Sequence, residues 1–535
     1  MPIEDVVHPF LKFYTAAPQW VKSSLGQMYA LAPARLRYGA RYDDFASEIA
    51  HCADPAWLQR RAAEKLLATL RWAADTVPAY AHLRREVMAC CAASAASAAN
   101  AANAGRAASA ASAAHGASCA PAQHATELLA RFPLLPKEAI KADPARYLSA
   151  RMKPGTHLLS FTGGSTSVPM KLYLEKYVSR AKDFAYNSAF DQLAGIGRGD
   201  TILALRGRTV PGAGKPGGPL WMFDPIKRYL HLSSDHLEPE YMPRYLDAIR
   251  QWRPAFIHAF PSALAPLARW LQEHPAPDIT RRVRAIQLFS ENVYDYQVDL
   301  MRAVFDCPVL LDYGHSERAV KAISLPHDGR YFFWPLYGKV ELVDSAGNAI
   351  DQAGVLGEIV ATGFDNRVMP LIRYRTGDLA MWSGAPNPAR PGFPVVERIE
   401  GRLQEFLVCR DHRLVSICTI GAAHFEQLAS AERMQFEQYA PGRAVLKVLS
   451  AADLSARARE ALAAGIRSKT QGGLEVDIVR VDQIARSVSG KHKLLLQRLD
   501  LSHYLGSAHA GAAQAGSAYA GAAHADRADA AGRRD

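Results

Sequence analysis

The stretch PAFIHAFPSALAPLARWLQEH, residues 254–274, joins a short apolar run to an amphipathic segment. The first part, residues 254–260, predicts a strand, and Pro261 and Ser262 open a segment whose apolar residues recur at helical spacing. The same alternation then continues along the chain. It predicts a strand in VRAIQLFS (283–290), a helix in NVYDYQVDLMRAVF (292–305) and a strand in CPVLLDYG (307–314).

This β-α-β-α-β order predicts an α/β protein with a parallel sheet and right-handed crossovers. Ligands of such sheets bind beyond the carboxyl ends of the strands. Two of the predicted strands end in polar clusters, Ser290-Glu291-Asn292 and Asp312-Tyr313-Gly314-His315-Ser316-Glu317. We therefore expect a ligand site beside these two clusters.

The texture of the sequence changes twice after this unit. Short strands with turn signals, KVELVDSAGNAI (339–350) and GEIVATGF (357–364), predict an antiparallel or barrel-like subdomain. From Gly401 to about residue 505 the pattern is typical of a small α/β module. We expect a large N-terminal domain, with a parallel sheet plus the barrel-like subdomain, and a small mobile C-terminal α/β domain.

Two segments carry almost no large apolar side chains. Residues 90–126 are low-complexity Ala, Ser and Asn, and residues 506–535 have the same character. Such segments cannot build a packed core, although their alanine content allows transient helix. The predicted organisation is a helical part at 1–89, an insertion at 90–126, the large domain at 127–400, the small domain at 401–505 and a disordered tail at 506–535.

Composition places the chain among globular proteins. Of 535 residues, 49% are hydrophobic and 21% charged, enough for two or three domains. The net charge of +11 comes from scattered Lys and Arg, which disfavours a nucleic-acid partner. No apolar run is long enough to span a membrane, and the seven cysteines form no CxxC pair. We expect a cytoplasmic protein with neither a zinc site nor a disulfide framework.

The stretch TGGSTSVP, residues 162–169, concentrates small hydrogen-bonding residues at one point of the chain. Gly163 and Gly164 permit unusual backbone angles, and the neighbouring hydroxyl and N–H groups suit an anion such as phosphate. A tight surface turn is an equally good reading of a Gly, Ser and Thr run considered alone.

The decision comes from four further motifs that follow in order. They are YGHSE (313–317), YRTGD (374–378), GRLQEF (401–406) and RSVSGKHK (486–493). The five motifs together resemble the adenylate-forming superfamily of acyl-CoA synthetases, and within it the phenylacetate-CoA ligase branch that includes capsular-polysaccharide-biosynthesis proteins. The resemblance covers roughly residues 130–500 and implies ATP, Mg²⁺ and CoA as cofactors.

The resemblance also implies roles for individual residues. Glu317 would bind Mg²⁺, Tyr313 would lie against adenine, and Asp378 would accept hydrogen bonds from the ribose. Lys491 would stabilise charge on the α-phosphate. The implied catalytic residues are Lys491, Glu317 and Thr166, and the implied ATP and AMP site comprises Thr162, Gly163, Gly164, Ser165, Thr166, Glu291, Asp312, Tyr313, Gly314, His315, Asp378 and Arg402.

Two positions depart from the family's pattern. Ser167 stands where a second glycine is common, which puts the closure of the phosphate loop in doubt. Glu405 stands where an Asp is common beside the hinge, with Gln404 as the expected pivot. Neither departure removes a charge that the chemistry needs.

The implied reaction is adenylation of a carboxylic acid, followed by transfer of the acyl group to CoA. Transfer to a non-CoA acceptor and a catalytically silent binding protein in polysaccharide biosynthesis are the alternatives. Joint retention of Glu317, Asp378, Arg402 and Lys491 argues against the silent protein. An aromatic or apolar substrate is suggested by a wall of Trp221, Phe256, His258, Phe260 and Phe289, although such residues also serve as core packing.

Overall fold

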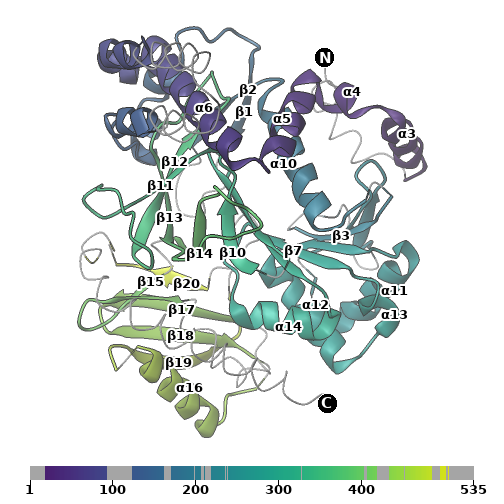
Figure 1. Ribbon diagram of the computed structural model, residues 1–535. Coiled ribbons are helices and arrows are strands. Elements are labelled where there is room, and N and C mark those ends of the chain that lie inside the picture. Colours follow the sequence, from purple (N-terminus) through teal and green to yellow (C-terminus); the bar gives the residue numbers. More distant parts are fainter. Residues whose placement is uncertain are drawn as a thin grey trace, which may run out of the picture.

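The computed structural model describes most of the chain. The described residues are 19–92, 123–161, 170–197, 199–206, 210, 218–234, 236–237, 239–326, 328–402, 406–417, 433–450, 452–470, 472–484, 494–499, 501 and 504. They form one 12-stranded sheet, one four-stranded sheet and two two-stranded sheets (Figure 1). The strand order of the large sheet is β11-β12-β13-β14-β10-β9-β8-β7-β6-β3-β5-β4.

The parallel half of the large sheet confirms the predicted alternation. Its five parallel strands, in spatial order, are β5 (Tyr229–Leu232), β3 (Ile202–Leu205), β6 (Phe256–Ala259), β7 (Ala285–Phe289) and β8 (Val309–Gly314). An antiparallel edge strand, β4 (Trp221–Asp224), closes this side. Their carboxyl ends share one edge, which brings the two polar clusters together as expected.

Helices cover both faces of these strands (Figure 1). One face packs against α11 (Met242–Trp252), α12 (Pro261–Glu273), α13 (Pro277–Thr280) and α14 (Asp295–Phe305). The other face packs against α10 (Ser179–Leu193), whose Tyr186 and Phe190 are fully buried. Side chains of successive strand residues therefore enter two separate cores.

The antiparallel half continues the same sheet beyond β8. Its strands are β9 (Lys321–Leu325), β10 (Asp328–Phe333), β14 (Val395–Arg402), β13 (Tyr374–Trp382), β12 (Leu356–Gly363) and β11 (Gly338–Val343). The predicted strands at 339–350 and 357–364 are β11 and β12. The antiparallel region therefore extends the parallel sheet instead of standing apart from it.

The N-terminal region is helical from Gln19, where the described residues begin. It contains α3 (Gln19–Leu31), α4 (Ala34–Tyr38), α5 (Ala40–His51) and α6 (Pro55–Thr76), and the short η2 (Pro78–Leu83), α9 (Lys137–Ala142) and η3 (Pro144–Tyr147) follow. Asp54 caps α6 by accepting hydrogen bonds from the N–H groups of Ala56 and Trp57. Residues 90–92 and 123–126 belong to helices, and the rest of the predicted insertion, like the tail at 506–535, lies outside the described residues.

A buried charge network ties these helices to the large sheet. Lys182 of α10 lies 3.2 Å from Asp365 Oδ2 and donates to the carbonyls of Tyr337 and Phe364 at 2.6 and 2.8 Å. Lys65 of α6 joins the same Asp365 carboxylate at 3.1 Å and Glu48 of α5 at 2.8 Å. Because these groups are largely removed from water, loss of one partner would leave a buried charge without compensation.

The four-stranded sheet is built from C-terminal residues (Figure 1, bottom). Its order is β19 (Glu475–Val481), β18 (Arg443–Leu449), β17 (Arg433–Ala440) and β20 (Leu495–Gln497), with α16 (Ala456–Lys469) against it. This sheet and helix have the α/β character expected for the residues after Gly401. Tyr294, at the start of α14, packs into the core of this small sheet.

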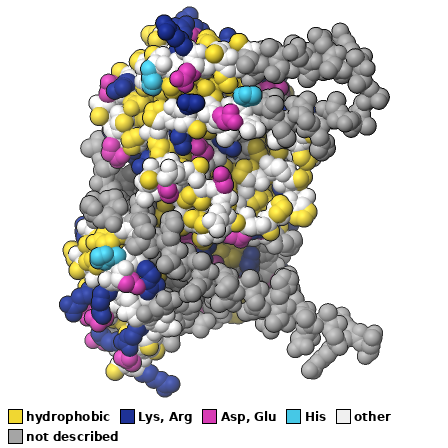
Figure 2. Space-filling model, turned by 60° about the vertical axis from the view of Figure 1, so that its left-hand side comes forward, with side chains coloured by type: hydrophobic (Ala, Val, Ile, Leu, Met, Phe, Trp, Pro, Cys, Tyr) yellow, Lys and Arg dark blue, Asp and Glu magenta, His cyan; other side chains and the backbone are white. Residues whose placement is uncertain are grey.

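Lys and Arg side chains lie at separate places across the face shown in Figure 2, among acidic and hydrophobic side chains. This distribution matches the scattered basic residues of the sequence. Among the described residues, no helix combines the length and the apolar character needed to cross a membrane.

Candidate active site

The edge formed by the carboxyl ends of β7 and β8 carries the predicted polar residues. Tyr313 and Gly314 end β8, and His315 and Glu317 lie in the turn that leads into β9. The strand β13 (Tyr374–Trp382) belongs to the antiparallel half of the sheet. It brings Tyr374 into contact with Glu317 and Asp378 into contact with Tyr313. Two hydrogen-bonded groups, Tyr313–Asp378 and His315–Glu317–Tyr374, thereby form one cluster of side chains, with the Tyr313 and His315 ring centroids 6.2 Å apart.

Tyr313 and Asp378 form the first pair of this cluster. The Tyr313 hydroxyl donates a 2.8 Å hydrogen bond to Asp378 Oδ2. Burial, and then the adjacent carboxylate, raise the pKa of Tyr313 well above its usual value. The phenol therefore keeps its proton near neutral pH and fixes the orientation of the carboxylate.

The YRTGD motif explains how Asp378 is positioned. Gly377 has a positive φ of 78°, and its N–H donates to Glu358 Oε1. Thr376 donates its hydroxyl to the Ile359 carbonyl and accepts from the Asp378 N–H. A glycine is needed at residue 377 because a Cβ would strain this left-handed backbone. On β14, Arg402 is the Cα partner of Asp378.

Glu317 is the second carboxylate of the cluster. Tyr374 donates to its Oε1 at 2.7 Å, and His315 Nδ1 lies 3.1 Å from its Oε2. Burial alone would raise the pKa of Glu317, but the hydrogen bonds from His315 and Tyr374 outweigh it and lower the pKa to about 2. Glu317 is thus a carboxylate at neutral pH, although only 9% of its side chain is exposed.

Tyr374 is a site residue that the sequence analysis missed. It is the first residue of YRTGD and is nearly fully buried, which in sequence indicates only a core tyrosine. Its position in the motif was the available signal. The hydrogen bond from Tyr374 to Glu317 forms only because β13 and β8 are aligned through the strands between them, β14, β10 and β9.

Asp312 and Glu291, both predicted to contact the nucleotide, are engaged by protein groups. Lys321 Nζ lies 3.0 and 3.2 Å from the two carboxylate oxygens of Asp312. Glu291 accepts hydrogen bonds from the N–H and hydroxyl of Ser262 at 3.1 and 3.0 Å. Glu291 therefore holds the first turn of α12 against the end of β7, as acidic groups at helix N-termini do.

Several predicted residues lie outside the described part of the chain. They are Thr162, Gly163, Gly164, Ser165, Thr166, Gln404, Glu405 and Lys491. The segment that carries the first five is bounded by β1 (His157–Phe161) and β2 (Lys171–Glu175). These strands pair antiparallel with Phe161 opposite Lys171, so the two ends of the predicted phosphate loop lie side by side.

The expected aromatic wall does not form one surface. Phe260 and Phe289 contact each other with ring centroids 5.4 Å apart. Phe256 is buried in the core beneath α10, whereas Trp221 packs edge-on against Trp252 on the other face of the sheet. The strand alternation separates these aromatic residues, which the sequence analysis grouped by composition alone.

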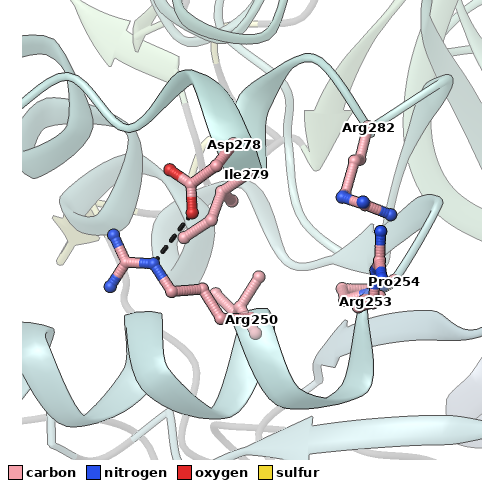
Figure 3. Close-up of a pocket in the computed structure, with 7 residues that line it drawn as sticks. Arg250, Arg253, Pro254, Asp278, Ile279 and Arg282 are labelled. Carbon is pink, nitrogen blue, oxygen red and sulfur yellow. Dashed lines mark hydrogen bonds and ion pairs between the residues drawn. The ribbon is translucent and has the colours of Figure 1, made fainter.

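A hollow of about 290 Å³ lies at the opposite edge of the sheet (Figure 3). Pro254 and Arg282, which line it, precede β6 and β7, so the hollow lies at the amino ends of these strands. Arg250 and Asp278 pair across it at 2.8 Å. The hollow is therefore separate from the candidate active site, which lies at the carboxyl ends of the strands.

Comparisons with known proteins bear on the fold. No protein-family model matches the chain. Protein CapK of Staphylococcus aureus is 24% identical over 265 residues, which cover 49% of this chain and 56% of that protein. The chain thus spans little more than half the length of this curated relative.

Two solved structures of 2-hydroxyisobutyryl-CoA ligase in the postadenylation state share the architecture. One, in complex with R3-HIB-AMP, has 17% identity and a TM-score of 0.58; the other, with 2-HIB-AMP, has 16% identity and a TM-score of 0.56. Each comparison covers 83% of this chain and 90% of the ligase. The chain therefore has the fold of these adenylate-forming acid–CoA ligases.

Proposed function

We propose that this protein uses ATP to adenylate a carboxylic acid and then transfers the acyl group to the thiol of CoA. The observation that carries the proposal is the anchored, ionised Glu317 beside the Tyr313–Asp378 pair, at the carboxyl ends of parallel strands. The fold and the order of the five motifs support the same reaction class.

The Tyr313–Asp378 pair would bind the nucleoside. The Tyr313 ring would lie against adenine, and Asp378, oriented by the phenol, would accept hydrogen bonds from the ribose hydroxyls. Arg402, opposite Asp378 in the β-ladder, would reach the ribose or the α-phosphate. A charged acceptor for a ribose diol gives this site its preference for a nucleotide.

Glu317 would hold Mg²⁺ together with the phosphates of ATP. The fit is chemical: an ionised carboxylate is a hard oxygen ligand, and Mg²⁺ is commonly bound by one or two carboxylates plus substrate phosphates. Within the described ranges no group of three or more His, Cys, Asp or Glu side chains is arranged to hold a metal. The bound ion would supply charge neutralisation on the phosphates.

The two chemical steps then follow. An oxygen of the substrate carboxylate attacks the α-phosphorus of ATP, the bond to the bridging oxygen breaks, and pyrophosphate leaves. Lys491 would stabilise the charge at the α-phosphate, and Thr162, Ser165 and Thr166 would donate to the β- and γ-phosphates. The CoA sulfur next attacks the acyl carbonyl and AMP leaves, after the small domain has rotated about Gln404 and Glu405.

The finer parts of the proposal concern the substrate and the setting. Phe260 and Phe289 would contact an aromatic ring, which is compatible with a phenylacetate-CoA ligase-like enzyme. We place this reaction in the cytoplasm, where ATP, Mg²⁺ and CoA are available together. The substrate is a small molecule, without a nucleic-acid partner.

Pyrophosphate release from MgATP tests the proposal across a panel of carboxylic acids. We expect release that depends on one acid and on Mg²⁺, with an acyl-CoA product when CoA is added. Asp378→Asn should weaken ATP binding, whereas the matched surface variant Asp247→Asn should not. Acid-dependent release without any thioester product would leave adenylation in place and overturn CoA as the acceptor.

A further inference from the structure

Two buried polar side chains face the same side of the large sheet beside the candidate site. His258 of β6 and Gln287 of β7 are Cα partners on adjacent parallel strands and are only 5% and 8% exposed. His258 Nε2 and Gln287 Oε1 have no hydrogen-bond partner among the described residues. Buried polar atoms without a hydrogen-bond partner are rare in proteins, and a bound ligand or water commonly satisfies them.

The other ends of both side chains are fixed by the protein. The Tyr229 hydroxyl lies 3.2 Å from His258 Nδ1, and Gln287 Nε2 donates to Asp312 Oδ2 at 3.1 Å. Asp312 is in turn held by Lys321. The amide of Gln287 is therefore oriented, and its oxygen is the atom without a partner.

The protonation states follow from burial. Burial raises the pKa of Tyr229 to about 12, and burial, with the nearby Arg206, lowers the pKa of His258 to about 3. Both groups are therefore neutral, and we assign the tautomer in which the phenol donates to Nδ1 and His258 Nε2 carries the proton. One donor, Nε2–H, and one acceptor, Oε1, are thus presented on neighbouring strands.

The two groups lie just inside the carboxyl edge of the sheet. Phe289, two residues after Gln287, ends β7, and the exposed Arg206, directly after β3, places its guanidinium 4.7 Å from the centre of the Phe289 ring. The next charged residue after β7 is Glu291. The pair therefore lies within the sheet, close to the edge that carries the candidate site.

We propose that His258 and Gln287 bind a hydroxyl substituent of the acid, so that the substrate is a hydroxylated carboxylic acid. This inference rests on the proposed function and names its substrate class. A hydroxyl oxygen accepts one hydrogen bond and donates another, and would satisfy both atoms at once. A hydrocarbon acid would leave them buried and unpaired, and a site built for a hydroxyl discriminates strongly against such an analogue.

The test compares acids in matched pairs, each hydroxy acid beside the acid that lacks only that hydroxyl. Pyrophosphate release gives kcat/KM for both members of every pair. For the pair that is turned over best, we expect the hydroxy acid to be preferred at least ten-fold. Equal kcat/KM within every pair would overturn the inference, because a resident water then fills the position, and would leave the proposed function intact.

Variants assign the preference to these two side chains. Gln287→Met and His258→Phe keep approximate volume and should each reduce the preference to less than three-fold, mainly by raising KM for the hydroxy acid. Phe256→Leu, on the same strand and face as His258, is the control and should slow both members equally. A preference that survives both variants would place hydroxyl recognition elsewhere.

Two outcomes separate the inference from the proposed function. Thermal unfolding with MgATP shows whether each variant folds. If one does not fold, the inference is judged from the other variant and from the wild-type ratio of kcat/KM between the hydroxy acid and its matched acid. If folded wild-type protein releases pyrophosphate with no acid of the panel, the proposed function fails and the inference fails with it.

Discussion

The hydroxyl of Tyr313, at the end of β8, donates a 2.8 Å hydrogen bond to Asp378 in β13, although three strands, β14, β10 and β9, separate the two in the order of the sheet. The two residues belong to separate motifs, YGHSE and YRTGD. Their contact shows that the large sheet joins these motifs into one site, with Glu317 and Tyr374 forming the neighbouring pair.

Removal of the Tyr313 hydroxyl should weaken nucleotide binding. Tyr313→Phe leaves Asp378 without the donor that orients it, and we expect the Kd for ATP to rise roughly ten-fold, as for a lost hydrogen bond to a charged group. Titration calorimetry measures this change. Tyr186→Phe is the matched control, because the hydroxyl of this buried tyrosine has no hydrogen-bond partner in the described part of the chain. Equal Kd values for both variants would remove Asp378 from the nucleotide site.

Glu317 should make stability depend on pH in acid. Its pKa is lowered from 4.5 to about 2, so its contribution is present above about pH 4.5 and is lost as the pH falls toward 2. The full contribution is about 3 kcal/mol. Denaturant unfolding of wild type and Glu317→Gln should give free energies that differ most at neutral pH and converge in acid. A difference independent of pH would contradict the ionised, anchored carboxylate.

The buried ion pair between Lys182 and Asp365 should contribute to the free energy of unfolding. Burial lowers the pKa of Lys182 to about 8, and Lys182→Met would leave Asp365 buried with one cation fewer. We expect a loss of about 3 kcal/mol in the free energy of unfolding. The exposed Lys153→Met should change it by less than about 0.5 kcal/mol. Similar small losses in both variants would show that the buried network is not coupled to folding.

The two half-reactions should separate at Lys491. Lys491→Ala should slow acyl-adenylate formation by about 100-fold or more, the loss typical of one strong electrostatic stabiliser, with little change in ATP affinity. The second step, started from synthetic acyl-adenylate and CoA, should continue because the rotated small domain would have moved Lys491 away. Equal losses in both steps would contradict the rotation.

The sequence predicted the local elements well. The strands β6, β7 and β8 and the helices α12 and α14 lie where the periodicity of residues 254–314 indicated, because apolar spacing and Pro261 act locally. The sequence could not show that Tyr374 would donate a hydrogen bond to Glu317 or that Lys321 would form an ion pair with Asp312. Those contacts depend on the order of strands across the sheet, and strand order is a non-local property.

The face of the sheet on which a single side chain lies could not be predicted from the sequence either. Trp221 and His258 do not share one wall, because strand alternation sends Trp221 to the core under α11 and His258 to the opposite face of the sheet. The orphaned Nε2 of His258 was invisible in the sequence, because only the folded chain shows which polar atoms lack a partner.

The central claim is adenylation, and the exchange of labelled pyrophosphate into ATP tests it without any assumption about the acceptor. The account predicts exchange that requires a carboxylic acid and Mg²⁺, needs no CoA and is lost in Glu317→Gln. Absence of exchange with every acid, in folded protein that binds ATP, would contradict it.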